Sequence, residues 1–229
     1  NVCAAVLFDL KFGSMAARPD VAMGYAACEA ALQGNPIQEG NVGAGTGCTI
    51  GKIRGPQYAM KGGLGTCAYR QGDLMVGAVM ACNAMGDVVE DGTILAGACN
   101  DDNTGFAGTE EWLIQHGQRQ RDIFSGKLVG ENTVIGCVVT NAALNKAQAA
   151  KLAAVAQNGI ARAVRPANAT FDGDSLFAMC HGTVPADPDA VGILAARAVE
   201  EAIRRGIRAA ETLHGRPAWR DLPFVSQST

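Results

Sequence analysis

An uninterrupted apolar run in the second half of the chain constrains the fold more than any other feature. Residues 134–139 (VIGCVV) follow one another without a polar side chain. Such a run is typical of a β-strand buried on both faces, because a strand with one solvated face alternates apolar and polar residues. We therefore expect this strand to lie between layers of other elements.

Two helices are expected after this strand. Ala149, Leu152, Ala153 and Ala156 recur at the spacing of one helix face. Asp187 followed by Pro188 predicts the start of a second helix, with an N-cap aspartate and a proline in the first turn. Between them, residues 175–180 (SLFAMC) predict a further strand.

The first half of the chain is expected to be richer in short strands. The apolar residues up to Phe8 predict a strand, and Arg18-Pro19-Asp20 predicts the start of a helix. Glycine-punctuated β segments are expected at residues 43–53, 63–70, 74–80 and 88–89, and residues 100–131 read as a polar irregular segment. The mixture of predicted strands and helices indicates a single α/β (α+β) domain over residues 1–229, with helix, sheet, sheet and helix layers.

Composition excludes several classes of function. The net charge of −3 leaves no excess of Lys and Arg to neutralise nucleic-acid phosphates. No apolar run reaches the length of about 18 residues that a membrane span needs, so we expect no membrane partner. The eight cysteines are never closer than 15 residues and form no metal-ligand pair. We interpret them as reduced, buried small hydrophobes, which favours a cytoplasmic location.

The glycine-rich run at residues 43–52 does not match a nucleotide-binding motif. Neither the G-x-G-x-x-G spacing nor a P-loop fits it, and no helix is expected to follow. Asp172-Gly173-Asp174 likewise lacks the ligand series of a calcium loop, and no Ser-His-Asp motif is present. We therefore expect no cofactor and no metal.

The junction Glu131-Asn132-Thr133 is the one candidate for chemistry. A polar segment meets a buried strand there, and the first strand residue carries a hydroxyl group. A threonine can act as a nucleophile without histidine if it is N-terminal, since its own α-amine, with a pKa of about 8, serves as the base. Such an enzyme must first cleave its own chain. The alternative is a threonine that merely begins a strand.

Motifs around this junction resemble those of the L-aminopeptidase/D-Ala-esterase-amidase family, which includes β-aminopeptidases and nylon-oligomer endo-hydrolases. The matching segments occur in the same order along nearly the whole chain: residues 41–47 (NVGAGTG), 61–65 (KGGLG), 131–133 (ENT), 139–141 (VTN) and 171–177 (FDGDSLF), with 6–10, 18–20 and 24–26 upstream. The resemblance implies an αββα sandwich and an N-terminal Ser or Thr nucleophile. It also implies self-association and hydrolysis of amide bonds in small peptides, amino-acid amides or amide oligomers.

By this resemblance, cleavage falls between Asn132 and Thr133 and yields subunits 1–132 and 133–229. Thr133 matches the nucleophile, and Lys52 matches a lysine beside it. Asn83 matches the asparagine that steadies the oxyanion, while Asp172 and Asp174 match an acidic pair near the nucleophile's amine. Each has a structural alternative: Lys52 as a solvated strand residue, Asn83 as a turn residue, and the two aspartates as a turn and helix cap.

Two other functions stay open at this stage. Family members usually carry an N-terminal segment before the region of Val6, which this sequence lacks, so a catalytically inactive binding or structural protein is one alternative. An ornithine acetyltransferase-like acyl transfer is the other, although no counterpart of the Lys-Gly-Thr-Gly-Met segment of those enzymes precedes Thr133. The sequence does not indicate the stereochemistry or length of a substrate.

Overall fold

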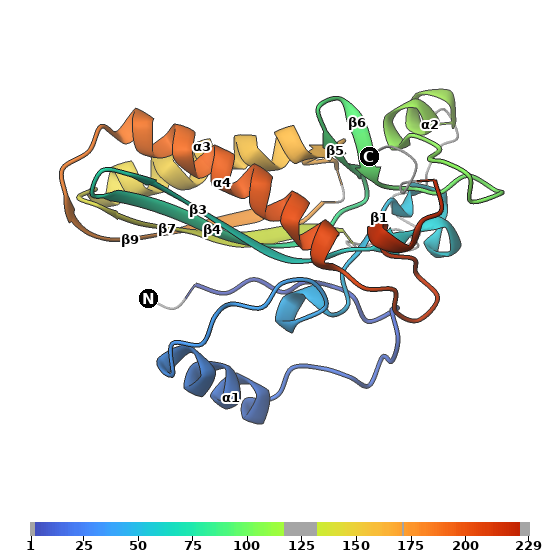
Figure 1. The fold of residues 1–229 in the computed structure, drawn as a ribbon, viewed down its shortest axis with the longest axis horizontal. Coiled ribbons are helices and arrows are strands. Elements are labelled where there is room, and N and C mark those ends of the chain that lie inside the picture. Colours follow the sequence, from blue (N-terminus) through green and yellow to red (C-terminus); the bar gives the residue numbers. More distant parts are fainter. Residues whose placement is uncertain (1–2, 117–131, 171, 225–229) are drawn as a thin grey trace.

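A computed structural model describes residues 3–116, 132–170 and 172–224. Its centre is a four-stranded sheet in the order β3-β4-β7-β9 (Figure 1). The strands are β3 (Gly63–Gln71), β4 (Leu74–Asn83), β7 (Thr133–Ala142) and β9 (Ser175–Val184). β4 pairs antiparallel with both β3 and β7, whereas β7 and β9 run parallel. The predicted strands at 63–70, 74–80, 134–139 and 175–180 are thus confirmed.

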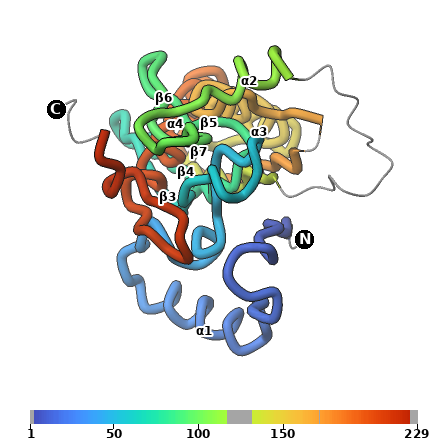
Figure 2. The backbone as a smooth tube through the Cα atoms, turned by 90° about the vertical axis from the view of Figure 1, so that its right-hand side faces the viewer, coloured from blue at the N-terminus to red at the C-terminus, as the bar shows by residue number. Residues whose placement is uncertain are grey.

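Two long helices, α3 (Lys146–Ala163) and α4 (Pro188–Ala209), lie across one face of this sheet (Figures 1 and 2). Asn145 caps α3 through a capping box with Gln148. Asp187 caps α4 by accepting hydrogen bonds from the backbone of Asp189 and Ala190. Both helices predicted from the sequence are confirmed, and the connection from β7 to β9 through α3 supplies the crossover that parallel strands require.

Glycine allows α4 to approach the sheet closely. A Cβ atom added to Gly65 of β3 would lie 2.0 Å from the carbonyl oxygen of Ala202, and one added to Gly63 would lie 2.4 Å from that of Gly206. Backbone therefore packs directly on backbone at this crossing, which only residues without a side chain permit. This close packing accounts for some of the many glycines in the sequence.

The main core lies between the sheet and the helices. Val134 and Val138 of β7 and Met80 of β4 are buried there with Val199 and Ile203 of α4. On the opposite face of β7, Ile135 and Cys137 are only half-buried and Val139 is 45% exposed. The expectation of a strand buried on both faces is therefore wrong for the described residues, because α3 and α4 cover only one side.

Two smaller sheets and a short helix lie at one end of the main sheet. β1 (Thr49–Ile50) pairs with β2 (Met60–Lys61), and β5 (Asp87–Glu90) lies between β6 (Thr93–Ala96) and β8 (Val164–Arg165). Only 49–50 of the predicted segment 43–53 is a strand, since 3₁₀ turns occupy Gly43–Gly45 and Lys52–Arg54. The segment predicted as irregular contains helix α2 (Thr109–His116), and its part from 117 to 131 lies outside the described residues.

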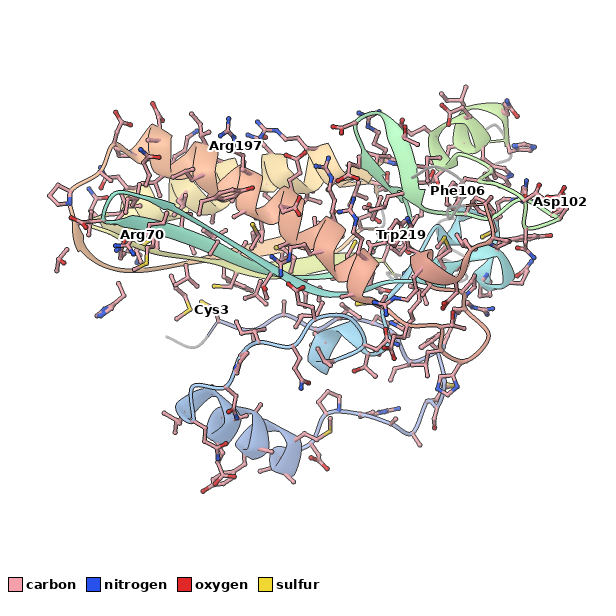
Figure 3. The ribbon with its side chains drawn as sticks, in the orientation of Figure 1. Cys3, Arg70, Asp102, Phe106, Arg197 and Trp219 are labelled. Carbon is pink, nitrogen blue, oxygen red and sulfur yellow. The ribbon has the colours of Figure 1, made fainter. Side chains whose placement is uncertain are left out.

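The N-terminal region lies on the side of the sheet away from α3 and α4. The expected helix is present as α1 (Val21–Leu32), capped by Asp20, but none of its residues is buried. The strand expected up to Phe8 is absent, because no neighbouring strand pairs with residues 3–8. Figure 3 shows Cys3 on this side of the sheet and Arg197 of α4 on the other.

The prediction that the cysteines are reduced and buried is only partly confirmed. All eight are free thiols, and Cys48, Cys82 and Cys99 are buried as expected. Cys3 and Cys28 are exposed, and the remaining three are half-buried. Across the described ranges, no helix is both long and apolar enough to cross a membrane.

Candidate active site

Strand register brings Asn83 and Thr133 together. The antiparallel pairing of β4 with β7 puts Asn83, the last residue of β4, directly opposite Thr133, the first residue of β7. Their neighbours Cys82 and Val134 belong to the core under the helices, so the two side chains point to the other face. Asn83 is 1% exposed and Thr133 is 5% exposed.

Hydrogen bonds fix the orientation of the Asn83 side chain. Its Oδ1 accepts from Lys52 Nζ at 2.9 Å and from the backbone N–H of Thr49 at 3.0 Å. Because both partners can only donate, the oxygen must face them, and this determines where the amide nitrogen lies. That nitrogen, Nδ2, donates to the carbonyl oxygen of Phe8 at 3.1 Å. Asn83 thus presents a fixed donor group on the side away from Lys52.

Lys52 is held at the same strand end by two bonds to Asn83. Besides Oδ1, its Nζ donates to the Asn83 carbonyl oxygen at 2.9 Å. Lys52 begins the 3₁₀ turn Lys52–Arg54, just after Gly51, whose φ of 69° and close approach to Ala98 favour glycine. Lys52 is thus a half-buried residue of a 3₁₀ turn and not of a strand, and Asn83 is the buried last residue of β4 and not a turn residue.

The segment before β9 lies beside the Asn132–Thr133 peptide. Asn132 forms a parallel bridge with Asp172, and the backbone N–H of Gly173 donates to the Asn132 carbonyl oxygen at 2.9 Å. Asp174 Oδ1 accepts from the backbone N–H of Val134 at 2.7 Å. The two aspartates therefore both lie on the β9 side of the first residues of β7, opposite the side on which β4 pairs.

The aspartates differ in how fully they are hydrogen bonded. Asp174 accepts from Asn168 as well as from Val134, while Asp172 Oδ2 accepts from the backbone N–H of Ala169 at 2.8 Å. Asp172 Oδ1 is buried and has no hydrogen-bond partner among the described residues. Burial raises the pKa of both carboxyl groups, and the charge of Asp174 raises the pKa of Asp172 further. Asp172 can accept another donor, such as an ammonium group.

A cavity of about 260 Å³ opens beside this cluster. Its lining residues come from the N-terminal region, the 49–59 region, β4 and the C-terminal turn: Phe8, Asp9, Lys11, Phe12, Thr49, Lys52, Pro56, Ala59, Asn83 and Arg216. Lys52 and Asn83 connect the cavity to the strand end that carries Thr133. In the described ranges, no three His, Cys, Asp or Glu side chains converge as metal ligands.

Three residues that contact this cluster were not among the candidates predicted from the sequence. Thr49 and Phe8 hold the Asn83 amide, and Gly173 contacts the Asn132 carbonyl through its backbone. Phe8 and Gly173 act through main-chain atoms, which residue type does not reveal. The proximity of Gly173 to Asn132 depends on the register of β9 against β7, which no local pattern encodes.

These features define a class of protein, the mixed α/β domain with the N-terminal-nucleophile (Ntn) hydrolase fold. The structure resembles the L-aminopeptidase D-Ala-esterase/amidase of Ochrobactrum anthropi, a variant of that fold, with a TM-score of 0.52 and 24% identity over 80% of this chain and 48% of that one. It resembles a Burkholderia sp. β-aminopeptidase with a TM-score of 0.55 and 23% identity over 84% and 54% of the two chains. The predicted fold class is confirmed.

The chain belongs to peptidase family S58, whose sequence profile matches residues 1–219. It is 33% identical to an uncharacterized aminopeptidase of Mycobacterium leprae, over 94% of this chain and 63% of the relative. It is 28% identical to the 6-aminohexanoate-oligomer endohydrolase of Paenarthrobacter ureafaciens, over 78% of this chain and 49% of that enzyme. The chain thus spans about half to two thirds of the length of these relatives. The family inferred from the motifs is confirmed.

Proposed function

We propose that this protein is a self-processing amide hydrolase whose nucleophile is Thr133, freed by cleavage after Asn132. The observation that carries the proposal is the start of β7. There the hydroxyl-bearing residue lies opposite Asn83, and the carbonyl oxygen of Asn132 accepts a hydrogen bond from Gly173. The products would be residues 1–132 and 133–229, held together as one domain by the sheet.

Self-cleavage begins with attack of Thr133 Oγ1 on the carbonyl carbon of Asn132. The hydroxyl proton passes to the Thr133 nitrogen as the C–N bond breaks, so the amide becomes an ester with a free amine. Water then hydrolyses the ester, giving the Asn132 carboxylate and restoring the Thr133 hydroxyl. Asp172 and Asp174 would stabilise the new ammonium group, and the unpartnered Oδ1 of Asp172 supports this assignment.

Hydrolysis of a substrate would use the same atoms. The Thr133 amine takes the hydroxyl proton while Oγ1 attacks the substrate carbonyl, and the proton then goes to the leaving amine. Water resolves the acyl-enzyme. Asn83 would donate to the developing oxyanion through Nδ2, a kind of contact worth roughly 3 kcal/mol of barrier. Lys52, bonded to Oδ1, would hold that amide in place and lower the pKa of the Thr133 hydroxyl.

The substrates we propose are small peptides, amino-acid amides or amide oligomers. Relatives named aminopeptidase and oligomer endohydrolase support this range, and a cavity of about 260 Å³ suits a small molecule. A substrate amine would approach the acidic pair. Self-association of the protein stays a prediction from the family resemblance.

Mass spectrometry under denaturing conditions tests the proposal. Freshly expressed protein should convert with time into two fragments that meet between Asn132 and Thr133. Thr133→Ala should remain full-length, whereas Thr133→Ser, which keeps a hydroxyl group, should still be cleaved. Turnover of amino-acid p-nitroanilides should appear together with cleavage. Persistent full-length wild-type protein that hydrolyses these substrates would contradict the proposed nucleophile, and cleaved protein inactive on every amide would favour a binding role.

A further inference from the structure

Lys61 is a completely buried lysine that the proposed chemistry does not use. It lies in β2 with 0% of its side chain exposed, the largest fully buried side chain of the described residues. Its Nζ donates to three backbone carbonyl oxygens, those of Gly45 at 2.9 Å, Cys48 at 2.9 Å and Gly62 at 2.8 Å. The three N–H donors of an ammonium group therefore match three acceptors.

In the part of the chain that the structure describes, no carboxylate forms an ion pair with this ammonium group within 4.0 Å. Among the described residues, the nearest ring is Phe12, whose centroid lies 5.6 Å from Nζ. Burying a charge without a counter-ion is costly, and a methionine would fill similar space without that cost. Packing alone thus gives no reason for a charged group here.

One peptide group connects Lys61 to Asn83. The carbonyl oxygen of Cys48 accepts from Lys61 Nζ, and the N–H of the same peptide, on Thr49, donates to Asn83 Oδ1 at 3.0 Å. Because a peptide group is planar and rigid, fixing its oxygen fixes the direction of its N–H. The backbone N–H of Gly62 also donates to the Cys48 oxygen, at 2.8 Å, so this peptide is held from two sides.

We propose that Lys61 is a positioning residue for Asn83, acting through the Cys48–Thr49 peptide to direct the Asn83 amide toward the reacting carbonyl. This inference rests on the proposed function, in which Asn83 donates to the oxyanion. Lys61 does not touch the substrate, so its loss should affect kcat much more than KM.

The protonation state of Lys61 supplies a specific test. Burial lowers the pKa of Lys61 to about 8, against opposing effects of Cys48 and Asp9, the titratable groups that act on it. Above this pH the neutral amine has only two N–H donors for three carbonyls, so the loop loses one bond. The advantage of wild type over a variant without the ammonium group should therefore shrink as the pH rises.

The experiment compares Lys61→Met with wild type, with the exposed Lys151→Met as control. At about pH 7, Lys61→Met should lower kcat by about 10- to 100-fold with little change in KM, the loss expected when a catalytic group is displaced by roughly 1 Å. The ratio of wild-type to variant kcat should fall as the pH rises through about 8, where Lys61 loses its proton. Because the Thr133 amine titrates in both proteins, its effect cancels in the ratio.

Two results would overturn the inference: an unchanged kcat in Lys61→Met, or a kcat ratio that does not vary with pH. Lys61→Arg, which keeps a positive donor group at all accessible pH values, should recover part of the lost kcat. Thr133→Ala separates the two proposals, since activity that survives it contradicts the proposed function and not the role of Lys61.

If the Lys61 variants do not fold, NMR on the ¹⁵N-labelled Thr133→Ala chain provides the test. The backbone N–H resonances of Gly62 and Thr49 should titrate with a midpoint near that of Lys61. Because this chain stays uncleaved, no α-amine is released at position 133 that could titrate in the same pH range. Resonances that stay constant from about pH 6.5 to about 9.5 would contradict the coupling.

Discussion

The backbone N–H of Gly173 donates to the carbonyl oxygen of Asn132 at an N···O distance of 2.9 Å. This carbonyl belongs to the peptide whose cleavage we propose. A donor already bonded to the oxygen would stabilise the negative charge that develops when Thr133 Oγ1 attacks. A Cβ added at Gly173 would lie 3.4 Å from Thr133 Oγ1, an ordinary contact, so the N–H can be tested separately from the missing side chain.

Gly173→Pro should slow self-cleavage by about 100-fold, since proline has no N–H and removal of one oxyanion donor has effects of this size. Gly173→Ala, which keeps the N–H, should cleave at close to the wild-type rate. The measurement is the time course of fragment formation by mass spectrometry, with circular dichroism to verify folding. Equal rates for the proline and alanine variants would remove Gly173 from the mechanism.

Asn83→Ala should lower kcat for amino-acid p-nitroanilides by about 10²- to 10³-fold and change KM little, because the lost contact forms only in the transition state. Asn141→Ala is the matched control. Asn141 lies at the other end of β7 and also holds backbone groups, those of Met75 and Asp73. Asn141→Ala should therefore lower the stability of the protein and leave kcat unchanged. A similar loss of kcat in both variants would indicate a purely structural role for Asn83.

Asp172→Asn should stabilise the protein at neutral pH while impairing self-cleavage. Because the pKa of Asp172 is raised, the folded state binds more protons than the unfolded state. The free energy of unfolding therefore falls as the pH rises above 3.8, the ordinary pKa of an aspartate. Removing the charge abolishes this loss. In the uncleaved Thr133→Ala background, a gain of about 1 kcal/mol corresponds to a Tm increase of about 2–4 °C at pH 7.

Asp101→Asn is the control for Asp172→Asn, because the pKa of Asp101 is lowered whereas that of Asp172 is raised. The hydrogen bond from Arg54 is the main cause that lowers the pKa of Asp101, so its carboxylate contributes stability above the ordinary pKa that is lost as the pH falls. Asp101→Asn should therefore lower the Tm at pH 7, and its difference from wild type should shrink in acid. Thermal unfolding curves from about pH 3 to 7 distinguish the two variants. An Asp172→Asn variant less stable than its parent at pH 7 would refute the first expectation.

Gly65→Ala should destabilise the packing of α4 on β3. The new methyl group would lie 2.0 Å from the Ala202 oxygen and 2.3 Å from the Gly206 nitrogen, and backbone atoms cannot move aside easily. Overpacking of this kind costs about 1–3 kcal/mol or more, measurable by urea denaturation. Gly24→Ala in α1, which meets no atom within 4 Å, should leave the stability unchanged or slightly increased. Equal midpoints for both variants would exclude a tight helix–sheet contact.

Local patterns in the sequence predicted most elements of the main sheet and its helices. The apolar run at 134–139, the Asp187-Pro188 start of α4 and the repeat around Leu152 all correspond to the observed elements. The strand expected up to Phe8 failed because a strand needs a partner, and composition does not show whether one is present. The prediction that β7 is buried on both faces was wrong for a related reason, because the elements that cover a strand come from distant parts of the chain.

The sequence by itself determined where the chain changes from polar segment to strand at Thr133, which side chains could carry out chemistry, and which family it resembles. Only the tertiary structure decided that Asn83 lies opposite Thr133, that Gly173 contacts the Asn132 carbonyl, and that Lys61 is buried against the loop that holds Asn83. Hydrophobic periodicity and helix caps depend on neighbouring residues, so they can be read locally. Strand register, main-chain hydrogen bonds and the burial of one charge depend on how segments far apart in the sequence pack together.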